Sequence, residues 1–232
     1  MFSAAIEEAE PEEQELDVFS IDVVRSIRCR IALLMLLSLL ALNTWSAPTA
    51  DKTLMVYGDS LSAAYGLDIN DGWVALLEQK LHKTHPNWQV INLSISGETT
   101  AGGLSRLPKA LEQYRPDLIL LELGANDGLR GTSLTSFKSN LESMLQMAQK
   151  QNIDVIMFEM QIPPNYGPVY TRRFTQTFHD LGKAHEVPVI PFFLDGVAGD
   201  ENLNQKDGIH PKAEAQPRLL SNVWSHLESR LK

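Results

Sequence analysis

From residue 51 onward, short apolar runs alternate with longer segments in which apolar residues recur every three or four positions. Short, continuous apolar runs are typical of strands that are buried on both faces of a sheet. They predict five strands, over 54–57, 90–93, 118–123, 155–159 and 187–192.

The segments between these runs predict helices over 73–82, 103–113, 135–151, 171–185 and 212–231. Asp71 is the candidate N-cap of the first of these helices, and Thr135 of the third. Five strands that alternate with helices predict an α/β fold, a three-layer α/β/α sandwich around a five-stranded parallel, doubly wound sheet. With right-handed crossovers, we expect by analogy the flavodoxin-like strand order 2-1-3-4-5.

The N-terminal region has the pattern of an export signal. Arg25, Arg28 and Arg30 precede the apolar run 31–42, and small or polar residues fill 43–50. This pattern predicts a signal peptide over 25–50, since the run is short for a membrane span. An N-terminal membrane anchor is the alternative, and cleavage after Ala47 or after Ala50 stays open.

Residues 1–24 carry eight acidic and no basic residues, which is unusual ahead of a basic signal sequence. They are either a disordered extension or the result of a mis-assigned upstream start, and we favour the second. The remaining domain, 51–232, has 17 Lys and Arg against 21 Asp and Glu, a net charge of −4. This charge gives no electrostatic reason to bind nucleic acid.

Cysteine chemistry is excluded from the predicted mature domain. The only cysteine, Cys29, lies before the apolar run and would be removed with the signal. Disulfides and cysteine-ligated metal sites are therefore not expected in 51–232.

Two polar motifs predict serine hydrolysis. Gly58-Asp59-Ser60-Leu61-Ser62 follows the first expected strand, and Asp207-Gly208-Ile209-His210-Pro211 lies near the C-terminus. Ser60 is the candidate nucleophile, His210 the general base and then acid, and Asp207 the carboxylate that orients the imidazole. Asp207 and His210 are three residues apart, so one turn of chain brings them together.

Donors for a developing oxyanion follow other strands. Gly97 follows the second expected strand and Asn126 the third. The backbone N–H groups of Ser60 and Gly97 and the side-chain amide of Asn126 are the candidate oxyanion hole. All of these groups are expected beyond the carboxyl ends of the strands, where doubly wound sheets bind their ligands.

Each motif has a structural alternative when it is taken alone. Gly-Asp-Ser can be an ordinary turn, and Gly124-Ala125-Asn126-Asp127 can be a loop or a helix cap. Asp-x-x-His can be a metal pair, but no third ligand stands at a recognisable spacing. The α/β-hydrolase elbow, Gly-x-Ser-x-Gly, does not match, because Ser62 stands two positions after Ser60.

The motifs together resemble the GDSL, or SGNH, hydrolase family, whose four blocks are matched by Ser60, Gly97, Asn126 and His210. The resemblance covers residues 53–230. The strings over 94–99, 122–131 and 207–211 are similar to the periplasmic subgroup of multifunctional acyl-CoA thioesterases, lysophospholipases and arylesterases. Ala125 departs from the pattern, since relatives often carry a glycine there.

The resemblance implies a serine esterase and thioesterase that works through an acyl-enzyme, without metal or cofactor. Its substrates would be small acyl esters and thioesters, namely lysophospholipids, acyl-CoA and aryl esters. It also implies a periplasmic protein. We expect no stable membrane insertion after signal removal; the oligomeric state stays open, with a monomer favoured. The segment 161–167 resembles the subgroup's loop beside the acyl pocket, which gives Ile162, Pro163, Pro164, Asn165 and Tyr166 as candidate substrate-binding residues. The segment 161–170 and the run 191–194 are candidates for apolar lining, and we expect at least one of Phe192 and Phe193 to lie in the core instead.

Two other functions compete with this one. A deacetylase of acetylated glycans would use the same chemistry in an open polar cleft instead of an apolar groove. A non-enzymatic binding module on a flavodoxin-like scaffold is weaker, because no phosphate-cradling glycine loop follows the first expected strand.

Overall fold

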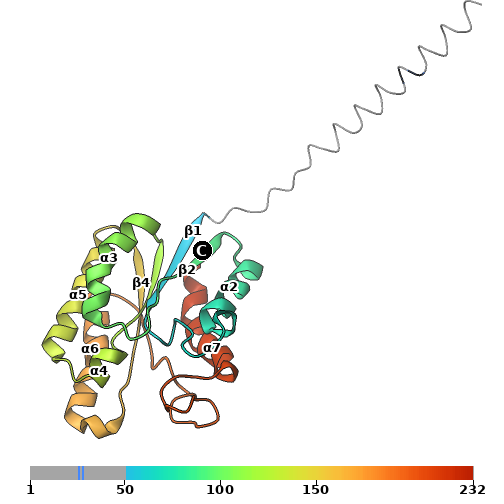
Figure 1. Cartoon of the computed structure of the whole chain (residues 1–232). Coiled ribbons are helices and arrows are strands. Elements are labelled where there is room, and N and C mark those ends of the chain that lie inside the picture. Colours follow the sequence, from blue (N-terminus) through green and yellow to red (C-terminus); the bar gives the residue numbers. More distant parts are fainter. Residues whose placement is uncertain (1–25, 27, 29–50, 232) are drawn as a thin grey trace, which may run out of the picture. The chain divides into compact units, whose positions relative to one another are not determined.

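Five apolar runs form the strands of one sheet in the computed structural model, which describes Ser26, Arg28 and residues 51–231. Figure 1 shows the arrangement of the elements. The strands are β1 (Lys52–Gly58), β2 (Trp88–Asn92), β3 (Leu118–Glu122), β4 (Asp154–Phe158) and β5 (Val189–Ile190). β1 and β3 are buried almost throughout, as their continuous apolar sequences predicted.

All neighbouring strands are parallel and lie in the order β2-β1-β3-β4-β5, which confirms the predicted flavodoxin-like sheet. The register pairs Gly58 with Glu122 and Val56 with Asn92. Three neighbouring strands therefore end close together, and the chain order reverses beside β1, where such sheets bind ligands.

Helices cover both faces of the sheet and complete the predicted three-layer sandwich (Figure 1). α2 (Trp73–Thr84) and α7 (Gln216–Leu227) pack together on one face, while α3 (Thr100–Tyr114), α5 (Leu134–Gln149) and α6 (Pro168–Ala184) cover the other. The remaining described helices are short: α4 (Ala125–Leu129) and the 3-10 turns η1 (Ile69–Asp71), η2 (Pro164–Tyr166), η3 (Ala213–Ala215) and η4 (Glu228–Arg230).

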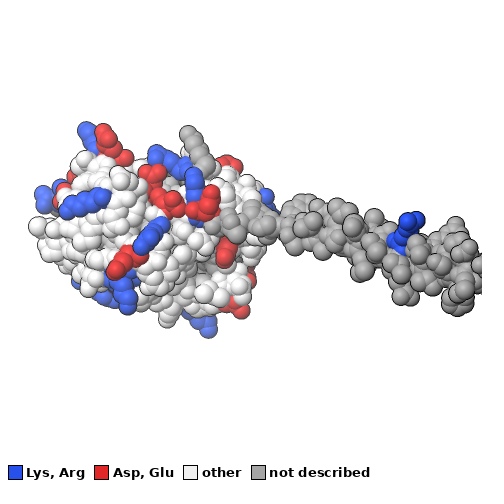
Figure 2. Space-filling model, turned by 90° about the horizontal axis from the view of Figure 1, so that it is seen from above, with Lys and Arg blue, Asp and Glu red and all other residues white. Residues whose placement is uncertain are grey.

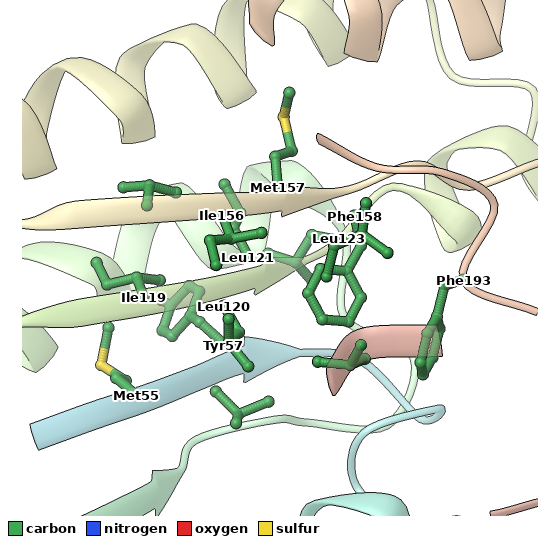
Figure 3. Close-up of a cluster of buried hydrophobic side chains, with 14 of the residues drawn as sticks. Met55, Tyr57, Ile119, Leu120, Leu121, Leu123, Ile156, Met157, Phe158 and Phe193 are labelled. Atoms are coloured by element: carbon green, nitrogen blue, oxygen red, sulfur yellow. The ribbon is translucent and has the colours of Figure 1, made fainter. Parts of the chain in front are cut away.

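The core is made by the strand side chains and by two groups of aromatic rings. Figure 3 shows strand residues such as Leu120 and Met157 packed between the layers, with Phe193 beside the end of β4. On the α2 side, Trp73 contacts Phe158 and Phe193 with ring centroids 5.9 and 5.5 Å apart. The rings of Phe137, Phe174 and Phe178 pack together on the α5 and α6 side. These contacts fix the sheet that carries the polar loops.

Several element ends differ from the predicted ones. The N-cap of α2 is Gly72, and Asp71 belongs to η1 instead. α5 begins at Leu134 with Ser133 as its N-cap, so Thr135 lies inside the helix and the predicted cap is wrong. β5 is shorter than predicted because it lies between Pro188 and Pro191, which have no backbone N–H to donate to a ladder.

The predicted extension over 1–24 and signal peptide over 25–50 lie outside the described residues, except for Ser26 and Arg28, and stay predictions. In the part of the chain that the structure describes, no helix has both the length and the apolar character needed to cross a bilayer.

Candidate active site

Ser60 lies in a tight turn directly after β1. The turn is held by backbone hydrogen bonds from Ala63 N to Asp59 O, at 3.0 Å, and from Tyr65 N to Ser60 O, at 3.2 Å. The close approach of this turn to β3 requires a glycine at position 58, since a Cβ there would lie 2.5 Å from Glu122 Oε2. Local packing therefore sets where the Ser60 hydroxyl lies.

His210 bridges Ser60 and Asp207. Its Nε2 lies 2.9 Å from Ser60 Oγ, and its Nδ1 lies 2.7 Å from Asp207 Oδ2. A carboxylate at Nδ1 fixes the proton on that nitrogen, which leaves Nε2 free to accept the Ser60 proton. The structure thus brings together the three residues that the sequence predicted to react together.

Asp207 is held in its ionised form. Its Oδ1 accepts hydrogen bonds from the backbone N–H groups of Ile209 and His210, at 2.9 and 3.0 Å. Partial burial works against ionisation, but these bonds and the His210 ring lower the pKa of Asp207 to about 2. The carboxylate that orients the imidazole therefore keeps its charge throughout the neutral range.

Gly97 lies in the loop after β2, which is tied to the nucleophile turn by a hydrogen bond from Ile95 N to Gly58 O, at 3.1 Å. Gly97 has φ +78°, and Arg130 donates a hydrogen bond of 3.0 Å to its carbonyl oxygen. Within residues 51–231, its own N–H donates no hydrogen bond and is available to a ligand.

Asn126 lies in the first turn of α4, a helix that the sequence did not predict. The residue before this helix, Gly124, has φ +125°, and a Cβ there would lie 2.8 Å from the ring of Phe137. Asn126 Nδ2 donates a hydrogen bond of 3.0 Å to Asp59 Oδ2, so the amide faces the turn that carries Ser60. Ala125 lies in α4 and has no positive φ, so the family's glycine is not needed here.

Two buried acids beneath Ser60 were missed by the sequence reasoning. Asp59 and Glu122 both have no exposed surface. Burial raises the pKa of Asp59 to about 6, and burial together with the Asp59 charge raises the pKa of Glu122 well above its usual range. The sequence signal that could have identified Glu122 is its position, because it is the only charged residue in the apolar run 118–123.

An apolar cavity of about 400 Å³ lies beside this site. Of the predicted substrate-binding residues, Ile162, Pro163 and Pro164 line it. Asn165 and Tyr166 do not line it, and the Tyr166 hydroxyl donates to Leu129 O at 2.8 Å.

Residues from several other loops complete the cavity wall. The remaining lining residues are Leu61, Ala125, Leu129, Met160, Gln161, Phe192, Leu194, Ala198, Gly199, Asn204, Gly208 and Ile209. Phe193 is fully buried, as expected for at least one of the two phenylalanines, whereas Phe192 lines the cavity. Leu61 and Ile209 are direct neighbours of Ser60 and His210 in sequence, so the cavity adjoins the Ser60–His210 pair.

Metal ligands do not gather in the described residues, where no group of three or more His, Cys, Asp or Glu side chains has the arrangement of a metal site. Another imidazole–carboxylate pair, His179 with Glu159 at 2.8 Å, has no serine in its hydrogen-bond network. Its Glu159 instead accepts a hydrogen bond from Gln161 in the loop that lines the cavity.

Comparison with known proteins gives consistent matches over the described domain. Residues 56–217 match the model of the GDSL-like Lipase/Acylhydrolase family. "Esterase TesA" of Pseudomonas aeruginosa is 46% identical over 198 residues, which are 85% of this chain and 98% of that protein. "Thioesterase 1/protease 1/lysophospholipase L1" of Escherichia coli is 41% identical over 82% of this chain and 89% of that protein.

Solved structures agree with these matches. A crystal structure of TesA has a TM-score of 0.75 and 47% identity, covering 78% of this chain and 100% of that one. The psychrotrophic esterase EstA from Pseudoalteromonas sp., inhibited by monoethylphosphonate, also has a TM-score of 0.75, with 41% identity over 78% of this chain and 99% of its own.

Proposed function

Since the chain belongs to the GDSL-like lipase/acylhydrolase family and is a serine hydrolase of esters, we propose that Ser60, His210 and Asp207 cleave acyl esters and thioesters through an acyl-enzyme. The proposed substrates are lysophospholipids, acyl-CoA and aryl esters, as the names of the relatives suggest. The observation that carries the proposal is the continuous hydrogen-bond chain from Ser60 Oγ through both ring nitrogens of His210 to Asp207.

In the first half of the reaction, Ser60 Oγ attacks the acyl carbon while His210 Nε2 takes its proton. Asp207 stabilises the imidazolium that forms, through the 2.7 Å contact at Nδ1. The backbone N–H groups of Ser60 and Gly97 and the amide of Asn126 donate to the oxyanion. His210 then gives its proton to the leaving alcohol or thiol, and Ser60 keeps the acyl group.

In the second half, water replaces the leaving group. His210 takes a proton from the water as it attacks the acyl-enzyme, and returns that proton to Ser60 Oγ when the carboxylic acid departs. Each proton is held by a group on the chain, so we expect EDTA to leave the rate unchanged. Loss of activity in EDTA would revive the metal pair as an interpretation of Asp207 and His210.

The cavity beside Ser60 favours an acyl chain over an acetylated glycan. Its wall is formed mainly by aliphatic side chains, prolines and Phe192, with few polar groups. Burial of a methylene group in such a wall gives about 0.8 kcal/mol, a gain that an acetyl group hardly uses. We therefore infer a preference for acyl groups longer than acetyl.

We also propose that the protein is exported to the periplasm and works there as a monomer. The support for export is the sequence over 25–50, with its basic residues, apolar run and small-residue end. N-terminal sequencing of the protein from the periplasmic fraction tests this, and an intact residue 25 in the exported protein would contradict signal removal.

The experiment that tests the activity is hydrolysis of p-nitrophenyl esters, from acetyl to palmitoyl, by the wild type and by Ser60→Ala. Activity on longer chains that disappears in Ser60→Ala, but persists in Ser96→Ala, is the expected result. Ser96 is the matched control because it is an exposed serine at the same end of the sheet. Activity confined to the acetyl ester would favour the glycan deacetylase, and a folded but inactive wild type would favour the binding module.

Ala198→Trp tests the cavity as the acyl site. Ala198 is exposed and lies on the cavity wall, so an indole there fills space without replacing a core side chain. We expect kcat/KM for the longer esters to fall about 10-fold or more, while the acetyl ester changes little. An equal loss on all chain lengths would place the acyl chain elsewhere.

A further inference from the structure

Two fully buried carboxyl groups lie under the nucleophile turn and have no part in the proton transfers described above. Glu122 ends β3, and its Oε2 accepts hydrogen bonds from Ser62 Oγ, at 2.7 Å, and from Asp59 N, at 3.2 Å. Asp59 accepts from Leu61 N through Oδ1, at 3.0 Å, and from Asn126 Nδ2 through Oδ2, at 3.0 Å. The pair therefore connects β3, the turn that carries Ser60, and α4.

We propose that Asp59 and Glu122 are a positioning pair for the ester hydrolysis. Glu122, as an un-ionised acid, holds the Gly58–Ser62 turn against β3, and Asp59, as a carboxylate, aims the Asn126 amide at the oxyanion. The inference rests on the proposed function, since it assigns how that site is held in its working geometry.

The contacts of the oxygens decide which acid carries the charge. Both oxygens of Asp59 accept an N–H donor, whereas Glu122 Oε1 is buried and has no hydrogen-bond partner among the described residues. A bare, buried carboxylate oxygen is much more costly than a neutral one. Two adjacent carboxylates would also repel each other, so a single negative charge lies on Asp59.

The charges around the pair support this division. His210, in the loop after β5, favours the ionised form of Asp59, while Asp127 of α4 works against it. Burial of Glu122 and the negative charge of the neighbouring Asp59 carboxylate both favour the protonated form of Glu122. Burial is the largest cause of both raised pKa values, and these neighbouring charges modify its effect.

The consequence for catalysis lies in the Asn126 amide. A planar amide has two N–H groups in fixed directions, so a bond from one of them to Asp59 fixes where the other points. The second N–H is the proposed oxyanion donor. Fixing it before the reaction stabilises the transition state more than the bound substrate, and we expect the pair to affect kcat more than KM.

A double-mutant cycle on the active, purified protein tests the role of Asp59. We expect Asp59→Asn to lower kcat about 10- to 100-fold and to leave KM for the ester nearly unchanged. In an Asn126→Ala background the same substitution should lower kcat by less than about threefold, because the group that it positions is already gone. Equal losses in both backgrounds would overturn the proposal.

Glu122 is tested with two substitutions of similar volume. Glu122→Gln keeps a neutral oxygen acceptor for Ser62 and Asp59 N, and should retain kcat within about threefold. Glu122→Met removes the acceptor and should lower kcat about 10-fold or more, with circular dichroism showing both variants folded. If Glu122→Gln lowers kcat as much as Glu122→Met does, the proposal that Glu122 is un-ionised is wrong.

The charge assignment can be read from the wild type itself. Infrared spectroscopy at pH 7 should show a protonated buried carboxyl group, and its band should be absent from Glu122→Gln. A spectrum of active wild-type protein without this band would refute the assignment. An inactive wild type, by contrast, would reject the proposed function, and the infrared band would still report whether Glu122 is protonated.

Discussion

The two ends of the sheet offer a ligand different surfaces. At the amino ends of the strands lies the larger hollow, about 720 Å³, whose wall carries Glu112, Arg115, Asp117, Asp154 and Arg230. Figure 2 looks onto this end and shows side chains of both charges interspersed on its face. At the carboxyl ends, the cavity beside Ser60 is about 400 Å³ and mainly apolar.

Size alone would therefore point away from Ser60 and His210. All parallel strands deliver their following loops to the carboxyl end, so side chains from distant parts of the sequence converge there. Every large hydrophobic side chain that is exposed in residues 51–231 also lies at that end: Tyr65, Ile69, Ile95, Tyr166, Val169 and Ile209. At the amino end, polar groups bind backbone instead, as Asp117 does by accepting from Thr53 N at 2.7 Å.

The largest effect should come from removing the base at the carboxyl end. We expect His210→Ala to lower kcat/KM by about 10,000-fold or more, because Ser60 then has no acceptor for its proton. His82→Ala is the control. It removes an exposed histidine in the last turn of α2, away from Ser60, and should have no measurable effect on ester hydrolysis. Ester hydrolysis by both variants checks this, and comparable losses would erase the distinction between the two ends.

A smaller loss should follow removal of one oxyanion donor. Asn126→Ala should lower kcat about 100- to 1,000-fold while changing KM little, since the amide acts on charge that develops in the transition state. Steady-state kinetics on one ester separates the two parameters. A higher KM with unchanged kcat would mean that Asn126 binds substrate only.

The stability of the folded protein should depend on pH through Asp59. Because the folded state raises the pKa of Asp59 from 3.8 to about 6, folding favours its protonated form, and stability is lost as the pH rises through this range. A shift of this size costs about 3 kcal/mol once Asp59 is ionised. Asp59→Asn should remove this cost, so its stability relative to the wild type should increase between pH 4 and pH 6.

Urea unfolding at several pH values measures that difference. Asp154→Asn is the matched control, because Asp154 is an exposed aspartate at the amino end of the sheet. A wild-type-minus-variant difference that is the same at pH 4 and pH 6 would contradict the buried charge at position 59.

The smallest effect is expected at the amino end. Arg115 caps α3 with φ +43°, a conformation that glycine adopts with less strain. Arg115→Gly should raise the free energy of unfolding by no more than about 1 kcal/mol, because glycine's greater backbone entropy offsets part of the gain. Ester hydrolysis should stay at the wild-type rate, and a large loss would connect the amino end to the chemistry.

The sequence predicted the sheet because its strands are buried on both faces, which leaves continuous apolar runs at β1, β3 and β4. Their parallel order then followed from the alternation with helices. Helix caps were harder to predict, since the N-cap of α2 is Gly72, which has no side chain to accept a hydrogen bond. The five-residue helix α4 has no apolar periodicity that a sequence could display.

The proposed catalytic groups could be located in the sequence because each needs a particular residue type in a loop that follows a strand. Asp59 and Glu122 could not, since their effect depends on tertiary contact across 63 positions of sequence. Asn165 and Tyr166 show the opposite problem. Their loop was located correctly, but which of its side chains line the cavity depends on how the loop folds.

The short segment that carries both Asp207 and His210 simplifies the assembly of the site. Three bonds inside it, from His210 to Asp207 and from Ile209 N to Asp207, are made between residues no more than three positions apart. Acid and base can therefore meet through local contacts alone, and of the contacts within the proposed triad only that of His210 with Ser60 is long-range. A substitution that displaced this segment would separate His210 from Ser60 and leave the contacts between His210 and Asp207 in place.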